Sequence, residues 1–263
     1  MKVLVTVKEI AEVGDDFTIE GTEIAESDLE YDLNEWDDYA VEAAVQLAEA
    51  GIADEVVSVT IGPERAEETI RMALAKGVDR AVRVWDDAFE EGFADVASKV
   101  EVLEAVVDEE APDLVLSGVQ ASDDAFGATG VALADRIGFE HAAVVNDLEI
   151  DADATVANVH RELEGGVEEL TEVDLPAVLT VQTGLNEPRY ASLRGIRQAQ
   201  RKEIAATDLD DLGLTAADVE SVLTLTSMYE PESESDAELI EGDAGEAAAR
   251  LAEVLREKGV GAS

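Results

Sequence analysis

The sequence contains no cysteine in its 263 residues, which excludes disulfide bonds, thiolate metal ligands and cysteine nucleophiles. It also has no apolar run that approaches the ~20 residues needed to span a membrane. Residues 1–8 carry too little charge before a very short apolar run to be a signal peptide, and no small-residue cleavage site follows. We therefore expect a cytoplasmic protein without direct membrane insertion.

Positive charge is scarce, because 18 Lys and Arg residues stand against 63 Asp and Glu residues, for a formal net charge of −45. This balance argues against nucleic acid as a partner, since phosphate binding needs a basic footprint. The acidic residues are spread along a chain with strong apolar periodicity, which argues against a disordered chain and an acidic tail. We interpret the charge as a halophilic adaptation, in which counterions screen self-repulsion.

Recognisable catalytic constellations are also missing. The two histidines, His141 and His160, lie in predicted strands without metal-ligand spacing and are interpreted as structural. No serine occupies a nucleophile elbow, and no acid/base pair stands out. We therefore predict no catalytic residue and no metal site, as expected for a carrier or a subunit rather than an enzyme.

Short apolar runs rich in β-branched residues alternate with segments of helical periodicity over the first 140 residues. Strands are predicted at 2–7, 55–61, 81–84 and 113–117. Helices are predicted after Asn34, after Pro63, at Phe93 and at Gly130. This alternation is typical of an α/β fold with a parallel-core, doubly wound sheet and helices on both faces, the type that binds adenine nucleotides. Residues 17–31 are polar and irregular and are interpreted as a hairpin excursion.

After residue 140, the predicted strands follow one another without helices, at 142–150, 155–161, 167–173 and 177–182. We expect them to extend the same sheet, some of them antiparallel, so that residues 1–204 form one α/β nucleotide-binding domain. From 205 the chain is acidic with sparse apolar residues, and it includes a polar linker at 229–236 and an amphipathic helix at 245–258. Residues 205–263 are therefore predicted to be a C-terminal arm that packs on something other than the chain's own core.

Residues 118–130 are the first candidate site. They follow a predicted parallel strand and open a helix, where N–H groups and the positive end of the helix dipole can hold phosphate. The glycines permit close backbone approach, and Thr129 could add a hydroxyl. The pattern is neither a P-loop nor G-x-G-x-x-G, so an ordinary strand-to-helix turn is an equal alternative. Asp123 and Asp124 would repel phosphate unless they face ribose or solvent.

Two further segments carry weaker and stronger signals. Asn34 to Asp37 could place a helix N-terminus near adenosine, although a plain N-cap is the preferred interpretation and Trp36 is more typical of a core. A basic island collects five of the 18 positive charges: Arg189, Arg194, Arg197, Arg201 and Lys202. It could meet an acidic partner or a flavin pyrophosphate. Compensation of a helix dipole is the alternative, which we weigh below the functional interpretation.

Several stretches resemble electron-transfer flavoprotein beta subunits. The most specific are Arg161–Leu170, Leu175–Thr180 and Leu185–Leu193, the last of which begins Leu-Asn-Glu-Pro-Arg-Tyr. Gly62-Pro63 with residues 68–80, Gly118-Val119-Gln120-Ala121 and the opening strand agree as well. The resemblance covers residues 1 to about 215, and the remainder matches only in being an arm.

The resemblance implies a heterodimer with an alpha subunit, in which FAD lies mainly in a mobile alpha domain. The beta subunit of this family normally buries AMP, and in the electron-bifurcating branch it holds a second FAD instead. The implied nucleotide-binding residues are Thr6, Asn34, Glu35, Trp36, Asp37, Ile61, Gly118, Gln120, Ala121, Asp123, Asp124, Gly127, Ala128 and Thr129. Phe126 is bulky and is expected to narrow the pocket, which favours AMP.

The resemblance also implies partner contacts. Residues 189–198 would be a recognition loop for flavin dehydrogenases such as the acyl-CoA dehydrogenases of fatty acid oxidation, with Leu193 as its apolar anchor. Arg189, Tyr190, Arg194 and Arg197 would surround that anchor, and Glu162 would contact the mobile flavin domain. Electrons would pass on to a membrane quinone oxidoreductase. The loop carries fewer positive charges than is usual in the family, which fits docking at high salt.

Two alternatives remain open. Within the family, the chain could serve an electron-bifurcating flavoprotein with two flavins. Outside it, a universal-stress-type regulatory protein that binds ATP as a homodimer would have a similar α/β sheet. The Leu185–Tyr190 run and the C-terminal arm count against that second alternative.

Overall fold

The predicted parallel strands form the centre of a nine-stranded sheet in the computed structural model, which describes residues 1–14, 16–90, 94–151, 153–231, 239–240 and 242–259. They are β1 (Lys2–Thr6), β6 (Glu55–Ile61), β7 (Arg80–Val84) and β8 (Leu114–Gly118). All pair in parallel, in the spatial order β8-β1-β6-β7. Val3, Leu4 and Val5 of β1 are fully buried, as expected for a strand covered on both faces.

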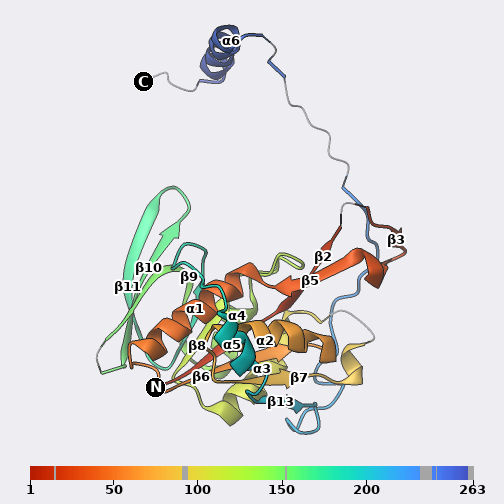
Figure 1. Cartoon of the computed structure of the whole chain (residues 1–263), viewed down its shortest axis with the longest axis vertical. Coiled ribbons are helices and arrows are strands. Elements are labelled where there is room, and N and C mark those ends of the chain that lie inside the picture. Colours follow the sequence, from red (N-terminus) through yellow and green to blue (C-terminus); the bar gives the residue numbers. More distant parts are fainter. Residues whose placement is uncertain (15, 91–93, 152, 232–238, 241, 260–263) are drawn as a thin grey trace. The chain divides into compact units, whose positions relative to one another are not determined.

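Helices cover both faces of this sheet, which confirms the doubly wound arrangement (Figure 1). They are α1 (Glu35–Glu49), α2 (Glu67–Lys76), α3 (Val96–Glu110) and α4 (Thr129–Ile137). Because strand side chains alternate between faces, Val3 and Val5 pack with α1 and α2, whereas Leu4 packs with α3 and α4. Phe93, the predicted start of α3, lies outside the described residues.

The later strands extend the sheet on one side, as predicted. They are β9 (Glu140–Ile150), β10 (Val156–Leu163), β11 (Val167–Asp174) and β12 (Ala177–Val181). Strand β12 is parallel to β8 and β9, whereas β10 is antiparallel to both β9 and β11. The turn at Gly165-Gly166 joins β10 to β11 into a hairpin that projects at the left of the view in Figure 1.

The predicted hairpin excursion is longer than its polar segment. Strands β2 (Glu9–Val13) and β5 (Leu29–Leu33) pair in antiparallel register, with β3 (Ile19–Glu20) and β4 (Glu23–Ile24) between them. Short 3₁₀ turns occur at η1 (Glu26–Asp28), η2 (Glu64–Ala66) and η3 (Asp87–Phe89). The excursion returns the chain to Asn34 and the start of α1.

The chain divides into two units at a later point than residue 204. Strand β13 (Ile204–Thr207) pairs with β7 and forms an edge of the central sheet. Leu209 and Val219 are buried in the core beside α3. Asp95, at the N-cap of α3, accepts hydrogen bonds from Ser221 Oγ (2.9 Å) and Val222 N (2.8 Å). The first unit therefore runs from Met1 to Met228, because its few apolar residues after 204 complete a buried edge.

The second unit, Tyr229–Ser263, contains one described helix, α6 (Ala244–Glu257). Its N-terminus has a capping box, in which Asp243 and Glu246 each bond the other's backbone N–H. Leu251 and Leu255 are about half exposed on the described part of this unit. The predicted amphipathic helix is confirmed, whereas the predicted linker at 229–236 lies mostly outside the described residues. Among the described helices of the chain, none is long and apolar enough to cross a membrane.

Candidate functional site

A cavity of about 360 Å³ lies at the carboxyl ends of the central strands. Thr6, Ile61 and Gly118 line it at the ends of β1, β6 and β8. The strand order reverses here, because β6 lies on one side of β1 and β8 on the other. Such a switch point is where open α/β sheets bind ligands, and the volume lies within the range of small-molecule sites.

Asp37 ties the start of α1 to two of these strand ends. Its Oδ2 accepts from the backbone N–H of Lys8 (2.8 Å), and its Oδ1 accepts from that of Gly118 (2.9 Å). Burial raises the pKa of Asp37 to about 6, although the two N–H donors and the Lys8 charge act in the opposite direction. Gly118 has no room for a side chain, since a Cβ there would lie 2.5 Å from Asp37 Oδ1.

Asn34 stands at the N-cap of α1, but its side chain does not cap the helix. Its Nδ2 instead donates to the carbonyl of Gln120 (2.9 Å), which links α1 to the loop after β8. The residue is 1% exposed and lines the cavity, and its Oδ1 has no hydrogen-bond partner among the described residues. A buried oxygen of this kind is satisfied when a ligand supplies a donor, such as an amine or a hydroxyl.

The turn into α4 is suited to an anion. Gly127 has a φ of +59°, and Ala128, at the N-cap, has no side chain that could cap the helix. Gly130 packs against the sheet, where a Cβ would lie 2.6 Å from Thr180 Cγ2. The first-turn N–H groups and the Thr129 hydroxyl therefore face a cavity wall that can hold phosphate.

Two lysines neutralise the aspartates of this loop. Lys8, just after β1, pairs with Asp123 and with Asp124 (2.9 Å), and Lys99 of α3 also pairs with Asp124. Burial alone would raise the pKa of Asp124, but these ion pairs hold it below its ordinary value. The expected repulsion of phosphate is thus offset by ammonium groups, and both lysines line the cavity.

The opposite wall is apolar and aromatic. Val59 and Ile61 of β6, Trp85 after β7, Phe89 of η3 and Leu103 of α3 contribute to it. The rings of Trp85 and Phe89 lie 5.6 Å apart between centroids. One cavity therefore offers an apolar surface for a flat ring and a polar end for an anion, which is the division that a nucleotide requires.

Most of the predicted nucleotide-binding residues meet at this cavity. Those that line it are Thr6, Asn34, Asp37, Ile61, Gly118, Gln120, Ala121, Asp123, Asp124, Gly127, Ala128 and Thr129. Glu35 and Trp36 stand outside the described lining, because α1 turns them away from it. Glu35 is exposed, and the Trp36 indole donates to Gln182 Oε1 (2.9 Å).

The prediction that Phe126 narrows the pocket is wrong. Ala125 and Gly127 both have positive φ, and the turn they make leaves Phe126 37% exposed and outside the described lining. Sequence reasoning also missed Lys8, Lys99 and Trp85. The only available signal was the scarcity of lysine, with six in the whole chain, two of which meet here.

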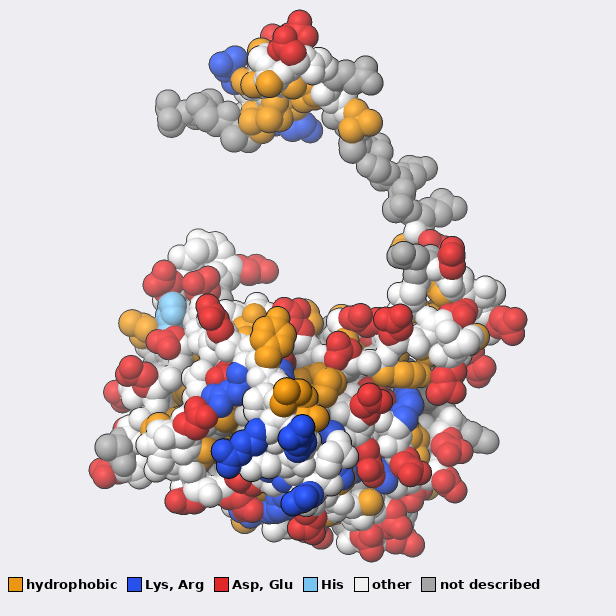
Figure 2. Space-filling model, viewed as in Figure 1, with side chains coloured by type: hydrophobic (Ala, Val, Ile, Leu, Met, Phe, Trp, Pro, Cys, Tyr) orange, Lys and Arg blue, Asp and Glu red, His pale blue; other side chains and the backbone are white. Residues whose placement is uncertain are grey.

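The basic island surrounds helix α5 (Leu193–Ala199), which packs on α2. Tyr190 is 97% exposed, Leu193 77% and Ile196 45%. Figure 2 shows hydrophobic and basic side chains gathered over α5 in the middle of a face otherwise rich in acidic groups. Arg194 and Arg197 are exposed and make no ion pair with a described residue. The surface has an apolar centre with a basic rim.

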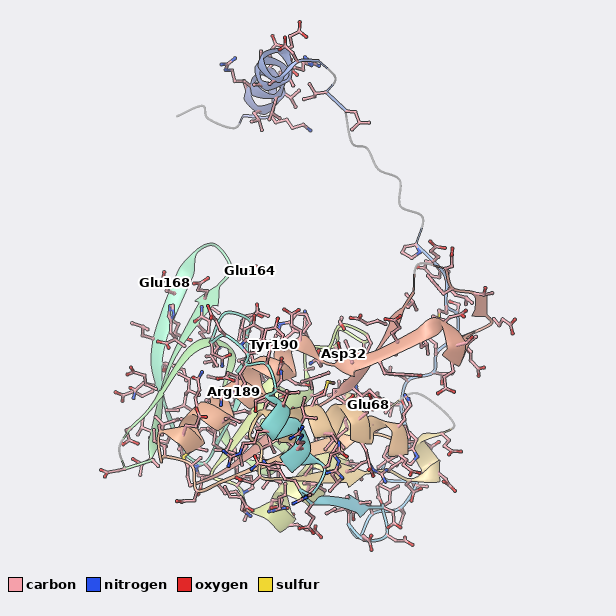
Figure 3. The ribbon with its side chains drawn as sticks, in the orientation of Figure 1. Asp32, Glu68, Glu164, Glu168, Arg189 and Tyr190 are labelled. Atoms are coloured by element: carbon pink, nitrogen blue, oxygen red, sulfur yellow. The ribbon has the colours of Figure 1, made fainter. Side chains whose placement is uncertain are left out.

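Arg189 does not belong to that rim, although the sequence placed it there. Its guanidinium pairs with Glu42 (2.7 Å) and Glu49 (2.6 Å) of α1 and is thereby held against the body of the protein. These hydrogen bonds raise the pKa of Arg189 and, despite burial, lower that of Glu42. Figure 3 shows Arg189 and Tyr190 just ahead of α5. Arg189 therefore anchors the segment and leaves Tyr190 outside.

The remaining predicted residues lie on the outer strands. Glu162 is exposed on β10, in the hairpin whose tip carries Glu164 and Glu168 (Figure 3). His141 lies on β9, and His160 lies on β10 with its Nε2 3.6 Å from Glu168. Within the described ranges, no group of three His, Cys, Asp or Glu side chains could hold a metal ion.

Comparison with known proteins adds a family. The electron transfer flavoprotein domain matches residues 21–212. The electron transfer flavoprotein subunit beta of Methylophilus methylotrophus is 46% identical over 263 residues, which cover 98% of each chain. The mitochondrial subunit beta of Arabidopsis thaliana is 35% identical over 233 residues, 88% of this chain and 90% of that one. The subunit beta of Bacillus subtilis is 34% identical over 258 residues, 97% and 98% of the two chains.

Proposed function

This chain belongs to the electron transfer flavoprotein beta subunits, and we propose that it forms a heterodimer with an alpha subunit that holds the FAD. As a member of that family it is an electron-transfer carrier subunit rather than an enzyme with its own catalytic residues. FAD supplies the redox chemistry when bound, and this chain supplies the scaffold, a nucleotide site and a docking surface. The family assignment decides against the universal-stress-type alternative.

The nucleotide in the cavity is AMP in this proposal. The apolar wall at Trp85 and Phe89 suits adenine, and Asn34 Oδ1 lacks a donor among the described residues. The first turn of α4 and the nearby lysines suit one phosphate. The carrying observation is the convergence of these groups at a single switch-point cavity.

A second FAD, as in an electron-bifurcating flavoprotein, is a second candidate for this cavity. A neighbouring cavity of about 600 Å³ shares Ile61, Trp85 and Phe89 with the first as lining residues. A ligand longer than AMP could extend past these side chains into it. Phe126 offers no steric argument against this, because it lies outside the described lining.

The partner surfaces follow the chemistry of the exposed groups. Leu193 and Tyr190 would enter an apolar recess on a flavin dehydrogenase such as an acyl-CoA dehydrogenase, while Arg194 and Arg197 meet an acidic rim. Electrons would pass on to a membrane quinone oxidoreductase. The half-exposed leucines of α6 would pack on the alpha subunit, and Glu162 would contact its flavin domain.

The test of the nucleotide assignment is a ligand count. We would co-express the chain with its alpha subunit, purify the heterodimer in high salt, denature it and quantify the released nucleotides by chromatography. One FAD and one AMP per heterodimer are expected. Two FAD and no AMP would establish the bifurcating type instead, and a chain that ignores the alpha subunit would contradict the proposal.

Leu193→Ala tests the docking surface. We expect the variant heterodimer to need about tenfold more protein for half-maximal electron transfer from an acyl-CoA dehydrogenase, because a central apolar anchor is lost. Its FAD and AMP content should stay normal. Leu225→Ala, at a leucine 45% exposed outside this segment, is the control and should leave transfer unaltered. Unchanged kinetics for Leu193→Ala would remove Leu193 from the anchor role.

A further inference from the structure

Helices α2 and α5 hold each other by their C-terminal ends. Arg71 of α2 donates from Nη1 to the carbonyl of Ala199 (2.6 Å), at the end of α5, and to that of Lys202 (2.7 Å). The last carbonyls of a helix have no partner within the helix. A guanidinium beside them supplies both donors and a favourable charge for the helix dipole.

The contact is reciprocal. Lys202, just after α5, donates from Nζ to the carbonyl of Leu74 (3.1 Å) and to that of Val78, which flank the end of α2. Its side chain is half buried, and burial lowers the pKa of its ammonium group. Lys202 thus serves the end of α2 as Arg71 serves the end of α5, and neither cation is presented to a partner.

Gly195 brings the two helices into backbone contact between these ends. A Cβ built on Gly195 would lie 2.2 Å from the carbonyl oxygen of Ala75 in α2. That oxygen is backbone and cannot swing aside as a flexible side chain could. Any side chain at position 195 would therefore push α5 away from α2, so glycine sets the height at which α5 lies.

The upstream end of the segment is anchored as well. Asn186 Nδ2 donates to the carbonyl of Tyr39 (3.0 Å), and Arg189 is paired with Glu42 and Glu49 of the same helix, α1. The exposed residues from Tyr190 to Ile196 lie between these anchors and the clamp on α2. A short seven-residue helix is thereby held at both ends by longer, buried helices.

We propose that Arg71, Gly195 and Lys202 are positioning residues for partner docking: they hold α5 so that Leu193, Ile196 and the exposed arginines face an apolar, acid-rimmed recess on the electron donor. This inference rests on the proposed docking role of Leu193. A surface ordered before contact loses little conformational freedom on binding, so its affinity depends on the residues that order it. None of the three touches the donor itself.

The experiment compares variants of the flavin-loaded heterodimer with an acyl-CoA dehydrogenase as electron donor. Gly195→Ala and Arg71→Met are each expected to raise the half-saturating concentration of the heterodimer about tenfold, with the maximal rate unchanged. Arg71→Lys, which can still reach one carbonyl, should recover part of the loss. Hydrogen exchange of residues 193–199 should speed up in Gly195→Ala and Arg71→Met. Gly14→Ala, where the nearest atom to a new Cβ is 4.0 Å away, should match the wild type in both measurements.

The outcomes separate this inference from the docking role on which it rests. If Leu193→Ala weakens docking but Gly195→Ala and Arg71→Met do not, the positioning role is overturned and the docking role stands. If Leu193→Ala has no effect, the docking role itself is overturned. In the Leu193→Ala background, Gly195→Ala should add little further loss, because both act through one anchor; full additivity would contradict the inference.

Discussion

Gly118→Ala is expected to weaken AMP binding at least about a hundredfold, because the new methyl group enters the joint that shapes the cavity. Its Cβ would lie 2.5 Å from Asp37 Oδ1, 2.7 Å from Trp36 Cβ and 3.0 Å from Asp37 N. The start of α1 must then move away from β8, which breaks the bond from Gly118 N to Asp37 (2.9 Å). Asn34, three residues earlier, would move with it.

Titration calorimetry of AMP into nucleotide-depleted heterodimer measures this loss, and thermal unfolding should report a destabilisation of about 1–3 kcal/mol from overpacking. Gly14→Ala again serves as the control, since it makes the same chemical change in open space. Wild-type AMP affinity in Gly118→Ala would mean that α1 and β8 separate without cost to the site, and would contradict the geometry derived for it.

Asp37→Asn is expected to change how stability depends on pH, because Asp37 is buried and burial raises its pKa to about 6 in the folded chain. The unfolded value is about 3.9, so the folded state binds the proton more tightly. The stability from that proton is fully present below the unfolded pKa and is lost as pH rises through the folded one. Relative to Asp37→Asn, the wild type should therefore lose up to about 3 kcal/mol between about pH 4 and pH 6.

Urea unfolding of both proteins, followed by tryptophan fluorescence at several pH values and constant ionic strength, measures this difference. Comparison with Asp37→Asn cancels the titration of the other acidic residues, which are present in both proteins. The variant should be less stable overall, because its amide cannot accept both backbone N–H groups. A stability difference that is constant with pH would show that Asp37 is already ionised throughout this range.

Much of the fold was predictable because it is written in local periodicity. The runs Lys2–Thr6 and Glu55–Ile61 are apolar and β-branched, and they became adjacent parallel strands. Asn34 and Gly127 mark where the chain turns into helices, and both line the cavity. The end of the first unit was missed, since β13 is a short edge strand whose few apolar residues have no period of their own.

The site was predictable only in part, because a side chain's direction depends on what its element packs against. Trp36 and Asp37 are neighbours in sequence, yet Asp37 lines the cavity whereas the Trp36 indole bonds Gln182 elsewhere. Arg189 and Arg194 belong to one basic run. The first is bound to two glutamates of α1, and the second is exposed.

By itself the sequence determined the strand and helix segments of an α/β fold, the absence of thiol chemistry and the family, since these depend on composition, periodicity and contiguous motifs. Only the tertiary structure decided that Lys8 and Lys99 meet Asp124, 116 and 25 residues away, and that Arg71 holds the end of α5 across 128 residues. Such pairs arise from the order of strands in the sheet and the faces on which helices pack. A charge has no periodicity from which its distant partner can be predicted.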